Sequence, residues 1–300
     1  MRDHLAIVFA SFVFFSSWPG SAHPPSALVI DPQRTNVYFA YWGGTWKIDN
    51  NDKLERIHSN DFHWLALDVT SRFTITNANF PLITPLGSKP SLFAFSDFPG
   101  TFDTNGCLYL APWSPGRIRL ERIPPDGKRE KFVDSPINPR LARKPNRHEG
   151  GIIAITTGPS GQVVVSDGAS IWIVSGSGVV TPFAENIIVS NCAEDLPAEL
   201  PKPHIRSLAV GAGGEIYAAA TGCRATLRIM PSGAVTTVLR SETPWTPCAV
   251  VESNGDLYVM EYDNAVAEWP QDGRPRIRRL SRGRQLEVLA VMEKAPERKR

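Results

Sequence analysis

The sequence lacks the features that would place it among helical, nucleotide-binding or nucleic-acid-binding proteins. No stretch of useful length has the 3.6-residue apolar period of an amphipathic helix. It contains no phosphate-binding loop, no GxSxG nucleophile turn and no dinucleotide fingerprint. The formal net charge is only +2, so the chain as a whole has little attraction for nucleic acid. We therefore expect no nucleic-acid partner.

Long apolar runs are also scarce, with a single exception at the start of the chain. Residues 5–15 read LAIVFASFVFF, follow Arg2, and lead into a small-residue segment that ends at Ala22. This order predicts a signal peptide over residues 1–22, and the apolar run is too short to span a bilayer as a stable helix. Asp3 weakens the positive start, so a retained anchor stays open as an alternative. We expect a secreted or periplasmic protein without a membrane span after signal removal.

Cysteine is rare and never occurs as a CxxC pair, which argues against a structural zinc site. Export would permit disulfides, and four cysteines allow three pairings. The four are Cys107, Cys192, Cys223 and Cys248.

What the chain does contain is a repeat of short β-rich segments separated by turns. The order strand, glycine turn, strand, loop, strand, turn, strand recurs from Ala27, Phe102, Ile152, Arg206 and Cys248, with a degenerate copy over residues 63–75. For the unit at Phe102, the first strand is expected just upstream in residues 91–97. Six units of roughly 35 to 54 residues predict an all-β, six-bladed β-propeller with four antiparallel strands per blade. A β-sandwich is the alternative.

The predicted propeller is one domain over residues 23–293, followed by a basic tail at residues 294–300. In each blade the first strand lines the central channel and the second returns. The start of the first strand and the end of the second therefore lie on one face, which we call the histidine face.

Three histidines are predicted to meet on that face. His63, His148 and His204 each precede the alanine of a first strand by three to six residues. Neutral imidazoles from separate elements can form an open three-ligand zinc site that activates water or polarises a carbonyl. Glu149 and Glu261 are candidates for a base or a supporting partner. The alternative interpretation is that each histidine is simply half-buried and hydrogen-bonded.

The repeat has the form G-x-[IL]-Y-V-A-D after an apolar strand, as in GDLYVMEYDN from Gly255, and it resembles the NHL repeat and the SMP-30/gluconolactonase-like propellers. The resemblance covers about residues 27–291 and implies the fold rather than a function. The histidine layout is similar to that of the peptidyl-hydroxyglycine amidating lyases. That similarity implies His63, His148 and His204 as zinc ligands, with Arg206 and Tyr262 as the arginine and tyrosine nearby. The metal set of the lactonases has no assignable counterpart here.

Two further features lie on the histidine face. The insertion at residues 187–203 carries Cys192, and Cys223 follows a second strand on the same face, so a Cys192–Cys223 bridge would pin the insertion there. Cys107 is expected to be unpaired, while Cys248 competes for either partner. Trp245 precedes the first strand of the last blade on this face. We expect its side chain to form an apolar wall or a stacking surface there, and the alternative is that it packs in the core.

The sequence supports three functional hypotheses. The first is a lyase or hydrolase that acts on a small molecule with a divalent metal, zinc or calcium. In it Glu149, Arg206, Glu261 and Tyr262 form the catalytic set. The second is a non-catalytic propeller that binds a ligand or a protein, and the third is a scaffold with incidental histidines. A basic loop before His148 favours an anionic ligand, and we expect a monomer.

Overall fold

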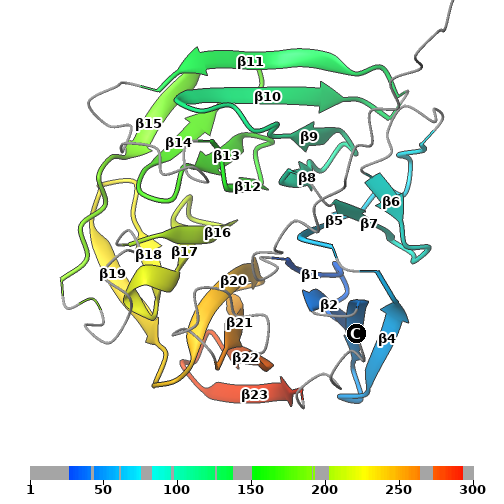
Figure 1. Ribbon diagram of the computed structural model, residues 1–300, viewed down its shortest axis with the longest axis vertical. Helices are drawn as coiled ribbons and strands as arrows, with labels where there is room; N and C mark the ends of the chain where they lie inside the picture. Colours follow the sequence, from blue (N-terminus) through cyan, green and yellow to red (C-terminus); the bar gives the residue numbers. More distant parts are fainter. Residues whose placement is uncertain are drawn as a thin grey trace, which may run out of the picture.

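The protein is a six-bladed β-propeller in a computed structural model (Figure 1). The structure describes residues 27–41, 44–60, 62–75, 83–95, 98–125, 127–137, 151–190, 192, 203–263 and 273–292. Within these ranges all regular structure is strand except one 3-10 turn, η1 (Thr221–Cys223). Among the same residues, no helix is long and apolar enough to cross a membrane.

Six antiparallel sheets surround the channel, and we number them as blades in chain order. Blade 1 contains β1 (Leu28–Ile30), β2 (Asn36–Tyr41), β3 (Gly44–Asp49) and β4 (Leu54–His58). Blade 2 contains β5 (Trp64–Asp68), β6 (Ile83–Pro85) and β7 (Ser91–Phe95). Blade 3 contains β8 (Gly100–Phe102), β9 (Leu108–Leu110), β10 (Arg117–Ile123) and β11 (Glu130–Pro136).

The second half of the ring has the same plan. Blade 4 contains β12 (Ala154–Thr157), β13 (Val163–Ser166), β14 (Ile171–Val174) and β15 (Val180–Ala184). Blade 5 contains β16 (Ile205–Val210), β17 (Ile216–Ala220), β18 (Ala225–Ile229) and β19 (Val235–Arg240). Blade 6 contains β20 (Thr246–Ser253), β21 (Asp256–Tyr262), β22 (Pro275–Leu280) and β23 (Leu286–Val291).

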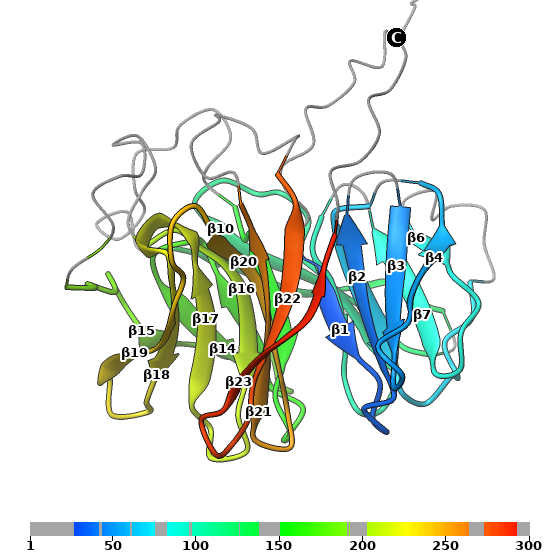
Figure 2. The ribbon, with the colours of Figure 1, turned by 90° about the horizontal axis from the view of Figure 1, so that it is seen from below.

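Burial follows the position of a strand in its blade. The strands that lie second from the channel, such as β13 (VVVS), are buried on both faces because neighbouring blades cover both sides of the sheet. The outermost strands, such as β4 and β19, are largely polar and exposed. Apolar clusters therefore lie between adjacent blades, and the strands run between two faces that carry the connecting loops (Figure 2).

One assignment made from the sequence was wrong. Residues 91–95 are not the first strand of blade 3 but form β7, the middle strand of blade 2, which pairs with both β5 and β6. The first strand of blade 3 is β8, which begins at Gly100. Residues 71–75, expected as the second strand of the degenerate unit, lie outside any strand. The order β5-β7-β6 is not sequential, so a pattern that reads strands in chain order misplaces them.

Among the described residues, each blade is built from one continuous segment, and no exchanged strand closes the ring. Blades 1 and 6 instead meet through side chains. Phe39 and Tyr41 of blade 1 pack in one cluster with Met260 and Tyr262 of blade 6. On the other face, Arg34 forms an ion pair with Asp256. In the described part of the chain, noncovalent contacts therefore hold the seam between the two ends of the propeller.

Candidate functional site at one mouth of the channel

The structure places the predicted strand ends together on the histidine face. Ile205, at the start of β16, is opposite Ala220 at the end of β17. Thr246, at the start of β20, is opposite Tyr262 at the end of β21. These strand ends lie at the mouth of the channel because β16 and β20 are the inner strands of their blades (Figure 1).

Two inner strands carry a β-bulge at this mouth. In β16 the register shifts between Ile205 and Ser207, which leaves Arg206 as an extra residue. In β20 the register shifts between Pro247 and Ala249, which leaves Cys248 as an extra residue. A bulge turns a side chain away from the regular alternation of the strand. A β-bulge therefore changes the direction of the side chain at both Arg206 and Cys248, in neighbouring blades.

His204 and Arg206 are directly bonded. His204 is 8% exposed and has a left-handed backbone, with φ of 46°. A histidine in this conformation is uncommon and marks a locally constrained backbone. Its carbonyl accepts a hydrogen bond from the Thr221 N–H at 3.1 Å. The Nε of Arg206 donates to the Nε2 of His204 at 3.2 Å, so the imidazole holds one side of the guanidinium.

Tyr262 is the second polar group in this part of the channel mouth. We call the set of His204, Arg206, Tyr262, Tyr41 and Cys248 the corner. Its ring lies 6.1 Å from that of Tyr41 across the seam between blades 6 and 1. The Tyr41 hydroxyl donates to the carbonyl of Gly273 at 3.0 Å. The Tyr262 hydroxyl is buried and has no hydrogen-bond partner among the described residues. Burial raises the pKa of Tyr262 well above its usual 10, with Cys248 and Tyr41 adding to the rise and Arg206 opposing it.

Cys248 completes the corner as a buried thiol. It donates to the Met260 carbonyl with its Sγ at 3.3 Å. Burial raises the pKa of Cys248 well above its usual 9, and the Arg206 charge opposes this rise. The thiol is therefore held neutral and is not a nucleophile in this state.

The predicted histidine triad is described only in part. His63, in blade 2, donates its backbone N–H to the Phe95 carbonyl at 3.1 Å and packs edge-on against Trp64 at 5.3 Å. His148 and Glu149 lie outside the described residues. Over the ranges that the structure describes, no three His, Cys, Asp or Glu side chains are grouped to hold a metal ion.

Glu261 has surroundings different from those of a catalytic base at the mouth. Its side chain is fully buried between blades 5 and 6. The carboxylate accepts from Arg276 at 2.5 Å, from Arg278 at 3.1 Å and from the Ser241 hydroxyl. Both of its oxygens are thus occupied by ion pairs that join the two blades. Tyr262, the next residue, faces the opposite side of the sheet.

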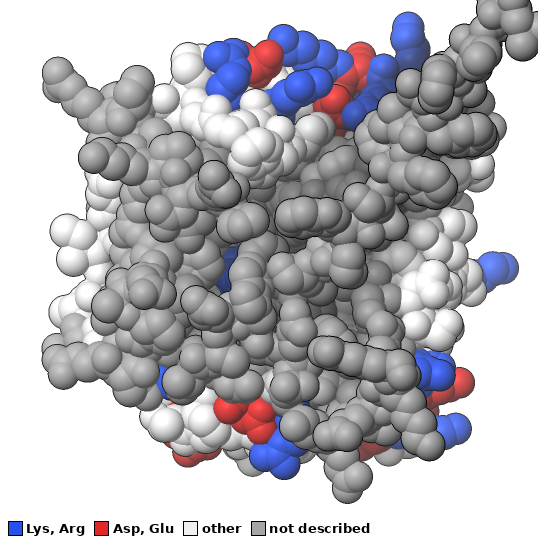
Figure 3. Space-filling view, viewed as in Figure 1, with Lys and Arg blue, Asp and Glu red and all other residues white. Residues whose placement is uncertain are grey.

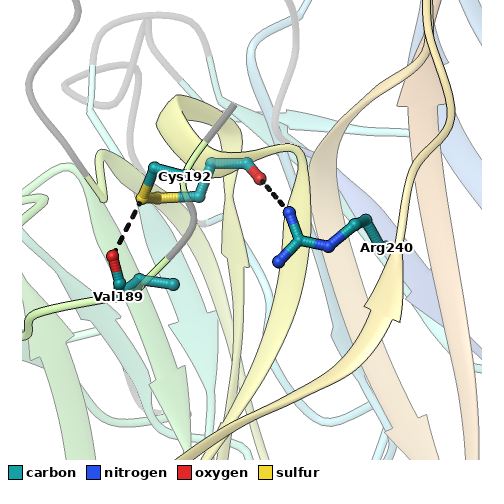
Figure 4. Close-up of a disulfide and its surroundings, with 4 residues drawn as sticks. Val189, Cys192 and Arg240 are labelled. Atoms are coloured by element: carbon teal, nitrogen blue, oxygen red, sulfur yellow. Dashed lines mark hydrogen bonds between the residues drawn. A yellow bond between two sulfur atoms is a disulfide. The ribbon is translucent and has the colours of Figure 1, made fainter. Parts of the chain in front are cut away.

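A disulfide joins Cys192 to Cys223 and ties the insertion after β15 to the end of the second strand of blade 5 (Figure 4). The Sγ of Cys192 lies 3.4 Å from the Val189 carbonyl, and Arg240 donates to the Cys223 carbonyl at 3.5 Å. Cys107 and Cys248 are not disulfide-bonded, so the predicted Cys192–Cys223 pairing is present.

The edge of the molecule over β10 and β11 carries mixed charge (Figure 3). Arg117 pairs there with Asp134, and Arg122 pairs with Glu130. These cations are neutralised by adjacent carboxylates. The described part of this edge is therefore not a cationic patch.

The sequence pattern put Arg206 and Tyr262 at strand ends on the histidine face, and it did not select two further residues of the corner. Tyr41 is 221 residues before Tyr262 in the chain, and nothing local marks the contact between them. Cys248 had been considered only as a disulfide candidate. A proline immediately before it is the one local hint of irregular pairing at this position.

Comparison with known proteins supports the fold. No family model matches the chain, and no curated protein matches it by sequence. Solved propellers do resemble it in structure. A protein assigned as a gluconolactonase has a TM-score of 0.52 and 16% identity, over 91% of this chain and 92% of its own.

Two further solved structures are similar in the same way. A luciferin-regenerating enzyme has a TM-score of 0.55 and 9% identity, over 90% of this chain and 94% of its own. Regucalcin from Agrobacterium tumefaciens has a TM-score of 0.51 and 12% identity, over 80% of this chain and 82% of its own. The chain thus has the six-bladed architecture of the SMP-30-like propellers, as its repeat predicted. Similarity at such low sequence identity supports the fold only, and the activity has to be argued from the residues of the site.

Proposed function

We propose that this protein binds a small anionic molecule at the mouth of the channel on the histidine face, with Arg206 and Tyr262 as the contacting residues. The observation that supports this most directly is the buried Tyr262 hydroxyl, which has no hydrogen-bond partner in the described part of the chain and lies near the Arg206 charge. An unsatisfied buried hydroxyl costs about 1–3 kcal/mol. An oxyanion that accepts from this hydroxyl and from the guanidinium would remove that cost and gain a charge-assisted bond.

The same corner supports hydrogen-bond donation rather than base chemistry. Because burial raises the pKa of Tyr262, its Oη stays protonated at neutral pH and can donate a hydrogen bond to a ligand oxygen. His204 orients Arg206 through the 3.2 Å bond between Nε of the arginine and Nε2 of the imidazole, so the guanidinium is positioned at the mouth. A lyase or hydrolase would use these residues to stabilise developing negative charge. Binding without turnover is the alternative, and it needs the same two contacts.

A divalent metal remains a separate prediction. The structurally similar regucalcin is described as a calcium-binding protein, and calcium takes oxygen ligands. The described residues of this chain do not fit such an ion. The Nε2 of His204 accepts from a cationic guanidinium, and the described ranges contain no three-residue ligand group. The predicted metal site of His63, His148 and His204 is tested by metal analysis of the purified full chain and of the variants His63→Ala, His148→Ala and His204→Ala. Stoichiometric metal that these variants lose would support it.

Export is proposed together with this function. A disulfide at Cys192–Cys223 is compatible with an oxidising compartment, and residues 1–22 have the order of a signal peptide. Mass measurement of the protein recovered from a secreting host tests both points. A chain that begins after Ala22 and carries one disulfide is the expected result.

Ligand binding is tested by thermal shift with a panel of small carboxylates and phosphates. We expect at least one to raise the melting temperature of the wild-type protein. The variants Arg206→Gln and Tyr262→Phe should weaken that binding by about tenfold or more each, since each removes a bond to a charged group. Arg119→Gln is the matched control, because Arg119 is a half-exposed cation on β10. Equal affinity in all four proteins would refute the proposal.

A further inference from the structure

A second corner of the histidine face, between blades 5 and 6, has an arginine with unused donors. The loop from β19 to β20 carries Trp245 and is fixed by Arg224, which is 2% exposed. One nitrogen of Arg224 donates to the carbonyls of Pro244 and Trp245, both at 2.8 Å. These bonds hold the backbone of the loop at the residue that carries the indole.

Arg276 lies against this indole and is held on two sides. Its guanidinium carbon is 4.1 Å from the centre of the Trp245 ring, a stacking contact that fixes its plane. Its Nε donates to Glu261 at 2.5 Å. The side chain is only 8% exposed. The arginine is therefore oriented before any ligand arrives.

At the terminal edge of the same guanidinium, only one of the two nitrogens has a partner among the described residues. Nη1 contacts Glu242 at 3.1 Å, whereas Nη2 is buried and has no partner among the described residues. The Glu242 side chain is 74% exposed and is attached to the loop, and it makes a single bond to this edge. A free carboxylate or phosphate can take both terminal nitrogens in the paired geometry that guanidinium favours.

The charge around this edge also favours an anion. Arg276 and Arg278 are both buried and share one buried carboxylate, Glu261. Among the described residues, Glu242 is the only other carboxylate that forms an ion pair with either arginine, and solvent screens it. Arg276 and Arg278 together therefore carry one positive charge more than the buried carboxylate that they share.

We propose that Arg276 and Trp245 form a binding site for the oxyanion of a small molecule, a carboxylate or a phosphate, which enters by displacing Glu242. The oxyanion accepts from Nη1 and Nη2 of Arg276 while the indole covers the guanidinium face. Arg276 lies on the blade 5 side of blade 6, and Tyr262 faces blade 1. This site is therefore distinct from the one proposed above and does not depend on it.

Tryptophan fluorescence of the full chain during titration with inorganic phosphate, and separately with acetate, tests the proposal. The protein has eight tryptophans, so the signal is assigned by its loss in Trp245→Phe. We expect saturable quenching or enhancement in the wild type. Glu242→Gln should bind about two- to fivefold more tightly, since it removes an exposed competing ion pair. A response to only one of the two probes identifies which oxyanion the site takes.

Arg276→Gln should lose binding, and Arg279→Gln should not. Arg279 is the matched control because it lies on the same strand and pairs with Glu287 at the surface. If Arg276→Gln fails to fold, Glu242→Gln and Trp245→Phe still decide the question. The proposal is overturned if neither probe gives a saturable response, or if the response persists in Trp245→Phe and is unchanged by Glu242→Gln.

Discussion

The ring and the hydroxyl of Tyr262 have different surroundings. It is packed in the apolar seam between blades 6 and 1, so its ring contributes to the core. Its hydroxyl has no partner in the described part of the chain. Natural cores rarely keep such a group unless it serves another purpose. We therefore expect the ring and the hydroxyl to have separable effects.

The variant Tyr262→Phe keeps the ring and removes only the hydroxyl. We expect its free energy of unfolding at pH 7 to equal or exceed that of the wild type by up to about 1 kcal/mol, because no hydrogen bond is lost and a desolvation cost is removed. Urea unfolding measures this difference. A loss of more than about 1 kcal/mol would mean that the hydroxyl has a partner.

The same residue predicts a difference at high pH. Since the folded state raises the pKa of Tyr262 above its unfolded value of about 10, its neutral form stabilises the fold below pH 10. That contribution is lost as the pH rises above 10. Wild-type stability should therefore fall more steeply than that of Tyr262→Phe between about pH 10 and 11. Tyr109, whose pKa burial raises to about 12, and Cys248 are present in both proteins and cancel in the comparison.

At the scale of elements, the sequence predicted the strands better than it predicted their partners. GDLYVMEY and GEIYAAA carry turn glycines and alternating apolar residues, and they form β21 and β17 as expected. β7 was assigned to the wrong blade because its partner β5 lies across a segment that carries no clear pattern. Strand propensity is local, whereas pairing depends on the whole ring.

The candidate site was predictable to a similar extent. Arg206 and Tyr262 follow from strand-end positions, which periodicity gives. The bulges at Arg206 and Cys248 do not, since a bulge depends on the length of the partner strand. The role of Glu261 was missed for a related reason: its partners Arg276 and Arg278 belong to the next strand of the same blade. Arg276 also stacks on Trp245, which the sequence left open between core and rim.

The disulfide is the element whose removal should cost most. Cys192 and Cys223 are separated by 31 residues, and closing a loop of that size corresponds to about 3–4 kcal/mol in the chain-entropy estimate. We expect Cys192→Ser to lower the free energy of unfolding by up to that amount. Cys107→Ser, at a half-buried cysteine outside any disulfide, should change it by less than about 1 kcal/mol. Equal stabilities in urea would show that the bridge does not constrain the unfolded chain.

For the whole molecule, the decisive feature is how the ring closes between blades 1 and 6. The four described strands of blade 1 and the four of blade 6 each follow one another in sequence, so no ladder of hydrogen bonds among the described strands crosses the seam. Side-chain contacts carry the closure. Arg34 pairs with Asp256 and contacts the Tyr258 hydroxyl at 3.3 Å, and Asp256 also accepts from the Arg282 N–H at 2.9 Å. The Tyr258 hydrogen bond is the main cause of the raised pKa of Arg34, ahead of that to Asp256.

The variant Asp256→Asn isolates this closure. Asparagine keeps an oxygen for the Arg282 N–H and loses only the charge opposite Arg34. Because the pair is partly buried and joins the two ends of the chain, we expect a loss of about 1–2 kcal/mol in urea unfolding. The matched control is Glu287→Gln, which breaks an exposed pair with Arg279 inside blade 6 and should cost less than about 0.5 kcal/mol. High salt should narrow the gap between the two variants only slightly, since partial burial limits screening of the seam pair. If both variants unfold at the same urea concentration, the seam is held by its apolar cluster and the ion pair contributes nothing to closure.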